Sequence, residues 1–170
     1  ENLAAINTLD GFGLSSDLYF ELTSPINVQT LNNDSVKLFA RQTDGSMEEV
    51  AIEIQSRSGD KFIKIRPTSG MLDPDTYHMM VVTTALQNAA GIAVESMTAG
   101  MLAMVEPPLV EEGRSTLDAL DNDSASRLEL VRSHTVPGLS NLYANGKLEA
   151  GNVAAAWTFK TMEIKETMLR

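Results

Sequence analysis

The segment TYHMMVVTTALQNAAGIAV, residues 76–94, decides the fold. It contains a long apolar strand pattern, a turn at Asn88–Gly91 and the beginning of a second strand. Because residues 79–82 are apolar on both faces, the first strand is predicted to lie in the centre of a sheet. In a β-sandwich the next strand would follow within about ten residues. The next clear strand pattern is VAAAWTFKT, residues 153–161, which leaves a long gap to be explained.

Three strand patterns precede this segment. SDLYFELTSPI, residues 16–26, places Leu18, Phe20 and Leu22 on one face. DSVKLFARQ, residues 34–42, alternates in the same way. EEVAIEIQSRSGDKFIKIRP, residues 48–67, alternates on both sides of a turn at residues 58–60, which is typical of a β-hairpin. We therefore expect a mainly β, antiparallel sandwich, with GIAVES, residues 91–96, as a further short strand and Trp157 and Phe159 in its core.

The gap has a different periodicity. From residue 98 to residue 146 the apolar residues recur at helical spacing, and Ser115, Ser126 and Thr135 stand where helix N-caps are expected. The pattern predicts three or four short helices inserted before the last strand, over about residues 97–147. Such short helices must pack on something to be stable. The apolar stripes that would do so are Leu117/Leu120, Leu128/Val131 and Leu139/Leu142/Tyr143.

Three phrases resemble those of bacterial Ig-like domains. They are LDPDTY at residues 72–77, QNAAG at residues 87–91 and WTFKT at residues 157–161. In such domains a comparable phrase leads into a Val-rich strand, a turn follows that strand, and a Trp-x-Phe-x-Thr phrase closes the domain. The resemblance implies an Ig-like β-sandwich and one domain over residues 1–170.

Two longer stretches are similar to the N-terminal domain of bacterial virulence-factor lipases. They are INTLDGFGLSSDLYFEL, residues 6–22, and VPGLSNLYANGKLEAGNVAAAWTFKT, residues 136–161. In that family a sandwich with a helical segment before its last strand precedes an α/β-hydrolase domain. The resemblance implies a non-catalytic accessory domain of a secreted or surface-exposed lipase. It also implies a location outside the cell or on the outer-membrane surface of a Gram-negative bacterium.

The composition limits the other possibilities. The net charge is −10 and Lys and Arg do not cluster, which argues against nucleic-acid binding and against anionic membranes. The absence of cysteine excludes disulfides, thiolate catalysis and Cys-ligated zinc. No apolar run is long enough for a transmembrane helix. Because the chain starts at Glu1, we expect a fragment of a longer protein. An adhesion or spacer module of a multidomain surface protein is the alternative function.

The sequence offers weak catalytic candidates. No Gly-x-Ser-x-Gly nucleophile elbow occurs. The nearest arrangement is Ser140 with His134 and an acid at Asp121 or Asp123, and we interpret it as part of a helix rather than a catalytic triad. His78 is interpreted as a residue on a sheet face. We therefore expect neither a catalytic site nor a cofactor.

Oxygen-rich segments and methionines are the remaining candidates. Residues 121–124, 32–35 and 73–75 carry Asp and Asn, but their spacing favours turns and N-caps over calcium ligands. Nine methionines are present. Met97, Met101 and Met104 recur at helical spacing, and flexible thioethers suit either a core or an adaptable apolar surface. We select these three as the contact with the downstream catalytic domain, with lipid as a further possible partner.

Overall fold

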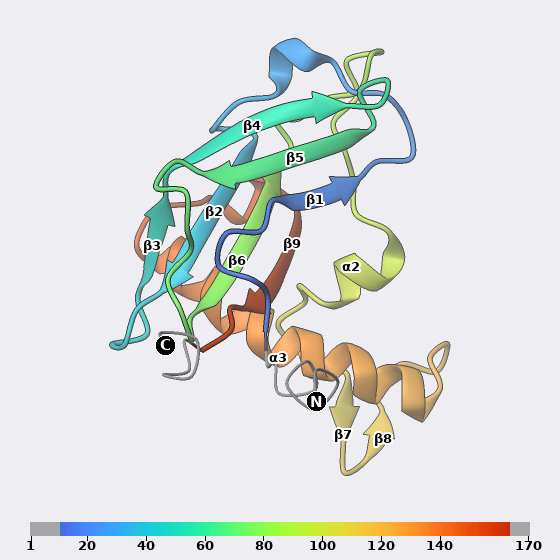
Figure 1. Cartoon of the computed structure of the whole chain (residues 1–170). Helices are drawn as coiled ribbons and strands as arrows, with labels where there is room; N and C mark the ends of the chain where they lie inside the picture. The colour runs from blue at the N-terminus through green and yellow to red at the C-terminus, as the bar shows by residue number, and fades with distance from the viewer. Residues whose placement is uncertain (1–10, 164–170) are drawn as a thin grey trace, which may run out of the picture.

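The computed structural model describes residues 11–163. Residues 6–10 of the lipase-like stretch and the charged tail after Glu163 lie outside this range. Two antiparallel sheets face each other (Figure 1). One sheet has the order β1-β5-β4, and the other has the order β3-β2-β6-β9. The fold is thus mainly β and consistent with a β-sandwich.

The bounds of the elements follow the sequence patterns closely in the β regions. In the smaller sheet, β1 is Leu18–Glu21, β4 is Ile52–Arg57 and β5 is Phe62–Pro67. In the larger sheet, β2 is Val36–Arg41, β3 is Met47–Val50, β6 is Tyr77–Thr83 and β9 is Val153–Lys160. The remaining elements are the 3-10 helices Val28–Thr30 and Ala150–Asn152, the helices α2 (Thr98–Leu102) and α3 (Asn122–Ala144), and the hairpin β7 (Val110–Glu111) and β8 (Arg114–Ser115).

The predicted hairpin and the predicted central strand are both present. β4 and β5 pair in antiparallel register from Ile52↔Pro67 to Arg57↔Phe62. The turn between them uses positive φ angles at Ser58, Gly59 and Asp60. β6 lies between β2 and β9, as its apolar pattern indicates. Residues 47–50, however, pair with β2 in the other sheet, so the chain changes sheets at Ala51.

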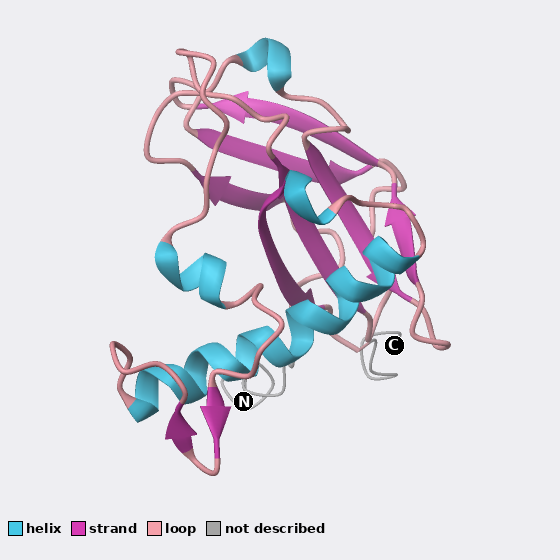
Figure 2. Ribbon diagram, turned by 180° about the vertical axis from the view of Figure 1, so that it is seen from behind, coloured by secondary structure: helices cyan, strands magenta, loops and turns pink. Residues whose placement is uncertain are grey.

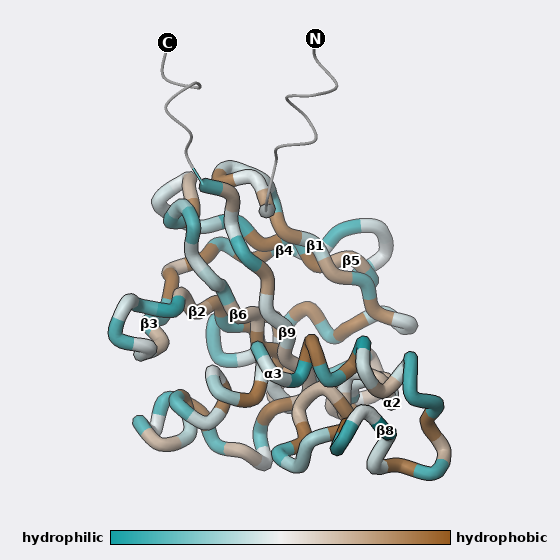
Figure 3. Tube along the Cα trace, turned by 90° about the horizontal axis from the view of Figure 1, so that it is seen from below, coloured by the Kyte–Doolittle hydropathy of each residue, from teal (hydrophilic) through white to brown (hydrophobic). Residues whose placement is uncertain are grey.

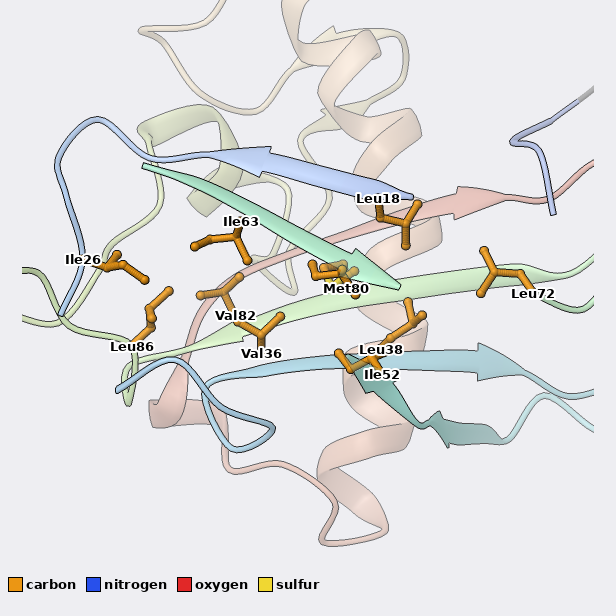
Figure 4. Close-up of a cluster of buried hydrophobic side chains, with 11 residues drawn as sticks. Leu18, Ile26, Val36, Leu38, Ile52, Ile63, Leu72, Met80, Val82 and Leu86 are labelled. Atoms are coloured by element: carbon orange, nitrogen blue, oxygen red, sulfur yellow. The ribbon is translucent and has the colours of Figure 1, made fainter. Parts of the chain in front are cut away.

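The larger sheet is covered on both faces. Met80 and Val82 of β6 point into the space between the two sheets, together with Val36, Leu38 and Ile63 (Figure 4). Their neighbours in sequence, Met79 and Val81, point the other way and pack with Leu139 and Leu142 of α3. The second core on that side is completed by Phe39, Met47, Leu139, Leu142, Leu148 and Ala156. β6 is apolar on both faces because the smaller sheet packs against one face of the larger sheet and α3 packs against the other (Figure 2).

Thr161 links two of the phrases that carried the resemblance. Its hydroxyl donates to the carbonyl of Asp73 at 2.6 Å and accepts from the amide of Thr76 at 3.0 Å. The backbone amide of Thr161 also donates to the carbonyl of Thr76 at 3.0 Å. The end of β9 is thereby fixed to the turn before β6. These hydrogen bonds explain why the two phrases occur in one sequence. The Thr that closes β9 needs the turn at residues 73–76 as its partner.

The helical part differs from its prediction. A single 23-residue helix, α3, replaces the two helices expected over residues 126–146, and Thr135 is buried inside it instead of capping a helix. Residues 115–120 form no helix, since the Ser115 hydroxyl closes a tight turn by accepting from the amide of Leu117. Residues 110–115 form a small hairpin instead. Residues 91–96 contribute only an isolated bridge, Gln87↔Ala93, where a strand was expected.

Candidate functional site

Of the three selected methionines, two are exposed. Met97 precedes α2 and is 74% exposed, and Met101 within α2 is 49% exposed. Met104 is partly buried and packs on the core between α3 and the larger sheet. The buried methionines Met47, Met79 and Met80 serve that core or the core between the sheets. A docking role thus suits Met97 and Met101, while Met104 belongs to the domain's own packing.

The amino-terminal half of α3 and the segment around α2 project beyond the sheets (Figures 1 and 2). We call residues 97–131 the helical overhang. Its exposed large apolar side chains are Met97, Met101, Leu117, Leu130 and Val131. The carboxyl-terminal half of α3, in contrast, buries Leu139 and Leu142 against the sheet. Of the apolar stripes expected to need a partner, only Leu139/Leu142/Tyr143 finds it on the sandwich.

A polar cluster holds residues 105–109 of the overhang to α3. Arg132 donates from Nε and Nη2 to the two carboxylate oxygens of Glu129, at 2.8 and 2.7 Å. The same Glu129 carboxylate accepts from the backbone amide of Leu109 at 2.7 Å, and Arg132 Nη1 donates to the carbonyl of Glu106 at 2.8 Å. The hydrogen bond from Arg132 lowers the pKa of Glu129 below its usual value. The loop at Pro107–Pro108 is therefore fixed in place between two hydrogen-bonded residues.

An apolar groove opens along the edge where β1 and β9 face each other. We call it the β1–β9 groove. One half, of about 360 Å³, is lined by Phe12, Leu18, Phe20, Trp157, Phe159 and other residues of both sheets. The other half, of about 230 Å³, is lined by Phe20, Leu22, Val94, Met97, Ala155 and Trp157 together with their neighbours. Phe20 and Trp157 meet edge to face between the halves, with ring centroids 5.6 Å apart.

The groove modifies the expectation for Trp157 and Phe159. Both side chains face the space between the sheets and pack against its core, as expected. Both remain only partly buried, because β1 and β9 are edge strands on the same side of the sandwich. The alternation of residues in a strand shows which of its faces is apolar. It does not show that the edge strands β1 and β9 lie on the same side of the sandwich, because that depends on the strand order of both sheets. The sequence interpretation missed the groove for this reason.

The catalytic candidates are not brought together. His134 and Ser140 both lie on α3, where six residues rotate the side chain by about 240° and advance it by about 9 Å. His134 instead stacks on Tyr77, with ring centroids 5.2 Å apart. Asp121 and Asp123 lie at the first turn of the helix, about 16 Å or more from His134 along its axis. The arrangement has no nucleophile and base in contact.

His78 is a buried residue of the sheet, in agreement with its interpretation. Its Nδ1 lies 3.1 Å from the carbonyl oxygen of Thr76, so Nδ1 carries the hydrogen and donates it. The ring stacks on Phe159 at a centroid distance of 5.4 Å. Nε2 is buried without a hydrogen-bond partner among residues 11–163. Burial lowers the pKa of His78 and keeps the ring neutral.

Two of the three oxygen-rich segments bond to backbone amides, whereas Asp75 of the third forms an ion pair with Lys160. Asp121 caps α3 by accepting from the amide of Ser124 at 2.9 Å, and this hydrogen bond lowers the pKa of Asp121. Asn32 accepts from the amides of Asp34 and Ser35. In the part of the chain that the structure describes, no three His, Asp or Glu side chains gather closely enough to hold a metal ion. Nor does any helix of that part have the length and apolarity needed to cross a membrane.

Comparison with known protein families and with curated proteins found no match to this chain. A functional assignment therefore depends on the geometry of the helical overhang and the β1–β9 groove, and on the phrases that resemble lipase N-terminal domains.

Proposed function

We propose that this chain is a non-catalytic N-terminal accessory domain, Ig-like in fold, of a secreted or surface-exposed lipase of a Gram-negative bacterium. It docks a downstream α/β-hydrolase domain through the helical overhang, with Met97 and Met101 as contact residues. Ester hydrolysis belongs to that downstream domain. The observation that carries the proposal is the exposure of Met97 and Met101 at 74% and 49% on a segment that projects from the sandwich.

The physical argument concerns the position of the exposed apolar side chains. Scattered apolar residues are normal on a protein surface, but a group on one projecting segment marks an interaction surface. The hydrogen bonds of Glu129 and Arg132 also fix the conformation of residues 105–109 of the overhang, so its surface is preorganised for binding. Figure 3 shows that apolar residues are not confined to the strands and recur along the segments around α2 and α3. Methionine suits such a contact, because its flexible thioether adapts to the partner.

The alternative function, an adhesion or spacer module, makes a different use of the same fold. A spacer needs only its sandwich and gains nothing from an apolar projection. The reading frame that follows Arg170 discriminates the two. An α/β-hydrolase with a Gly-x-Ser-x-Gly phrase supports the accessory domain, whereas further Ig-like repeats support the spacer.

Hydrogen exchange tests the docking directly. Amides of residues 97–104 are expected to exchange more slowly in the full-length protein than in the 170-residue chain. Met97→Lys with Met101→Lys should remove this difference. Met71→Lys is the matched control, because Met71 is 61% exposed on a loop outside the overhang. Equal exchange rates of residues 97–104 in the long and short proteins would contradict the proposal.

An esterase assay tests the non-catalytic assignment. The 170-residue chain is expected to hydrolyse short and long p-nitrophenyl esters no faster than buffer. Turnover that disappears in Ser140→Ala would contradict the assignment, and this outcome is independent of the exchange measurement.

A further inference from the structure

The outer edge of β9 carries backbone groups that no described strand uses. β9 pairs with β6 on one side only. At its carboxyl end, the carbonyl of Lys160 accepts from the amide of Phe12 at 2.8 Å, so the backbone of residue 160 points away from β6. The register with β6 is regular from Tyr77↔Lys160 to Val82↔Ala155. Because alternate residues of a strand point their backbone groups to the same side, those of Thr158 and Ala156 also point outward.

Phe12 shows how this edge can be used. It forms a parallel bridge with Thr161, in which its amide donates to Lys160 and its carbonyl accepts from Met162 at 2.9 Å. One residue of a parallel strand is therefore already seated on the edge. From Thr158 to Ala154 no backbone hydrogen bond joins the outer edge to another strand of residues 11–163.

The side chains beside this edge complete the site. A strand added along β9 would turn alternate side chains into the space between the sheets, next to Ala155, Trp157 and Phe159. That space is the β1–β9 groove, whose two halves lie on either side of the Phe20–Trp157 ring pair. The groove is apolar and partly open, which suits side chains two residues apart in an extended peptide.

The rim of the groove is acidic. Glu21 and Glu95 line one half, and both are exposed. Neither carboxylate forms an ion pair with another residue of the described chain. The whole chain carries a net charge of −10. A basic peptide is therefore favoured over an acidic one, and a second copy of this acidic chain is disfavoured.

We propose that the β1–β9 groove binds an extended polypeptide segment of a partner, with apolar side chains at alternate positions and Lys or Arg between them. The segment adds to β9 as a strand in line with Phe12. Its amides bond to Thr158 and Ala156, and its apolar side chains enter the groove beside Phe20 and Trp157. Met97 lines one half of the groove and is also a contact residue of the proposed docking, so the two proposals share this residue. Peptide binding is measured on the 170-residue chain without a hydrolase domain, so its failure is distinguishable from a failure of the docking.

Trp157 provides the readout, because it is the only tryptophan of the chain and lies in the groove. The probe is a nonapeptide of alternating Lys and Val, blocked at both ends and titrated into the 170-residue chain. A saturable blue shift of the Trp157 emission is expected as water leaves the ring. The same peptide with N-methyl groups on the amides facing β9 should bind at least about tenfold more weakly. A peptide with Glu in place of Lys should also bind more weakly.

Variants of the chain locate the binding. Thr158→Pro removes an outward N–H and is tolerated on an edge strand, so it should abolish the shift while the chain stays folded by circular dichroism. Glu21→Lys with Glu95→Lys should weaken binding. Glu53→Lys on β4, in a strand at the other edge of the smaller sheet, is the matched control and should leave binding unchanged.

Four results would overturn the proposal. Absence of any shift would show that the groove takes no peptide. Equal affinity of the N-methylated peptide would show that apolar side chains bind without strand addition. An equal shift on adding phosphatidylcholine vesicles alone would assign the groove to an acyl chain. A blue shift of the Trp157 emission that increases with protein concentration in the absence of peptide, together with a dimer in sedimentation, would assign the groove to a second copy of the chain.

Discussion

His78 shows how burial decides the behaviour of a single residue. Its ring lies between Phe159 and the turn before β6, and only Nδ1 has a hydrogen-bond partner in the described chain. The carbonyl that Nδ1 bonds, that of Thr76, also accepts from the amide of Thr161. The carbonyl of Thr76 would therefore keep a hydrogen bond without His78. Protonation of the His78 ring, in contrast, would place a charge inside the sandwich.

This arrangement gives a pH-dependent stability of known sign. Because burial lowers the pKa of His78, the unfolded chain takes up a proton at a higher pH than the folded chain. The free energy of unfolding should be undiminished above about pH 6.5 and fall as the pH drops from there toward the lowered pKa. His78→Phe should reduce this dependence, as measured by urea unfolding at pH 7.5 and pH 5.5. His134→Gln, at an exposed position of α3, is the control, and an equal slope in His78→Phe and the natural chain would refute the assignment.

Trp157 gives a second prediction at the level of the residue. Its ring packs on Phe20 and the core between the sheets but remains partly exposed in the β1–β9 groove. Trp157→Ala should therefore cost about 2 kcal/mol, less than the roughly 3–5 kcal/mol typical of a fully buried Trp or Phe. The denaturant midpoint measures it, and Tyr19→Ala, at a 58% exposed position of β1, should have a much smaller effect. An unchanged midpoint in Trp157→Ala would show that the ring does not face the core.

Among the elements, the strands of the two large sheets were mostly predictable, whereas the helices, the small hairpin at residues 110–115 and the absence of a strand at residues 91–96 were not. Alternation of apolar residues is a local signal, and β1, β2, β4, β5, β6 and β9 all lie where it placed them. Helix boundaries depended on Ser and Thr residues that stand before apolar runs. Thr135 has such a position, yet its hydroxyl donates to the carbonyl of Val131 at 2.9 Å from inside α3. A Thr in a helix interior satisfies its hydroxyl in this way. The residue type alone therefore does not distinguish an N-cap position from a position inside a helix.

The candidate site was predictable to a smaller extent. Helical spacing identified the three methionines, but spacing does not show which side of a segment meets the sheet. Met97 and Met101 are exposed and Met104 packs on the core. The difference depends on where residues 103–109 run over α3, which is set by the distant partners Glu129 and Arg132.

The Glu129–Arg132 cluster can be tested as a unit of the helical overhang. Glu129→Ala leaves the guanidinium of Arg132 without its carboxylate and the amide of Leu109 without its acceptor. The expected cost is about 1–3 kcal/mol, with faster hydrogen exchange confined to residues 105–117. Glu111→Ala on the nearby hairpin is the control, because its exposed side chain has no such partners among residues 11–163. Unchanged exchange at residues 105–117 would show that the loop is held by other contacts.

Pro137 is the other test within α3. Proline lacks the amide that would donate to the carbonyl of Ser133 and it crowds the preceding turn. Pro137→Ala should raise the free energy of unfolding by about 1–3 kcal/mol. Ser140→Ala, at an exposed position of the same helix, should give about 0.5 kcal/mol or less. A loss of stability in Pro137→Ala would show that the proline ring contributes more to stability than the missing hydrogen bond costs.

In the whole molecule, the two cores share one sheet. β6 sends Met80 and Val82 into the sandwich and Met79 and Val81 toward α3. α3 is also tied to the edge strand β3, because its Asn141 accepts from the amide of Met47 at 3.2 Å. Lys147, which follows the helix, donates to the carbonyl of Met47 at 2.6 Å. Damage to the packing of α3 is therefore transmitted to the sheet through side chains and backbone together.

Leu139 and Leu130 lie on the same helix and test this coupling. Leu139 is 2% exposed and packs on the sheet, whereas Leu130 is 65% exposed on the helical overhang. Leu139→Ala should cost about 2–4 kcal/mol, and Leu130→Ala should stay within about 0.5 kcal/mol. In Leu139→Ala the amides of β2 and β6 should exchange faster together with those of α3, since one cooperative unit contains both cores. Faster exchange in α3 with unchanged β2 and β6 would instead make the helix a separate folding unit that rests on an independent sandwich.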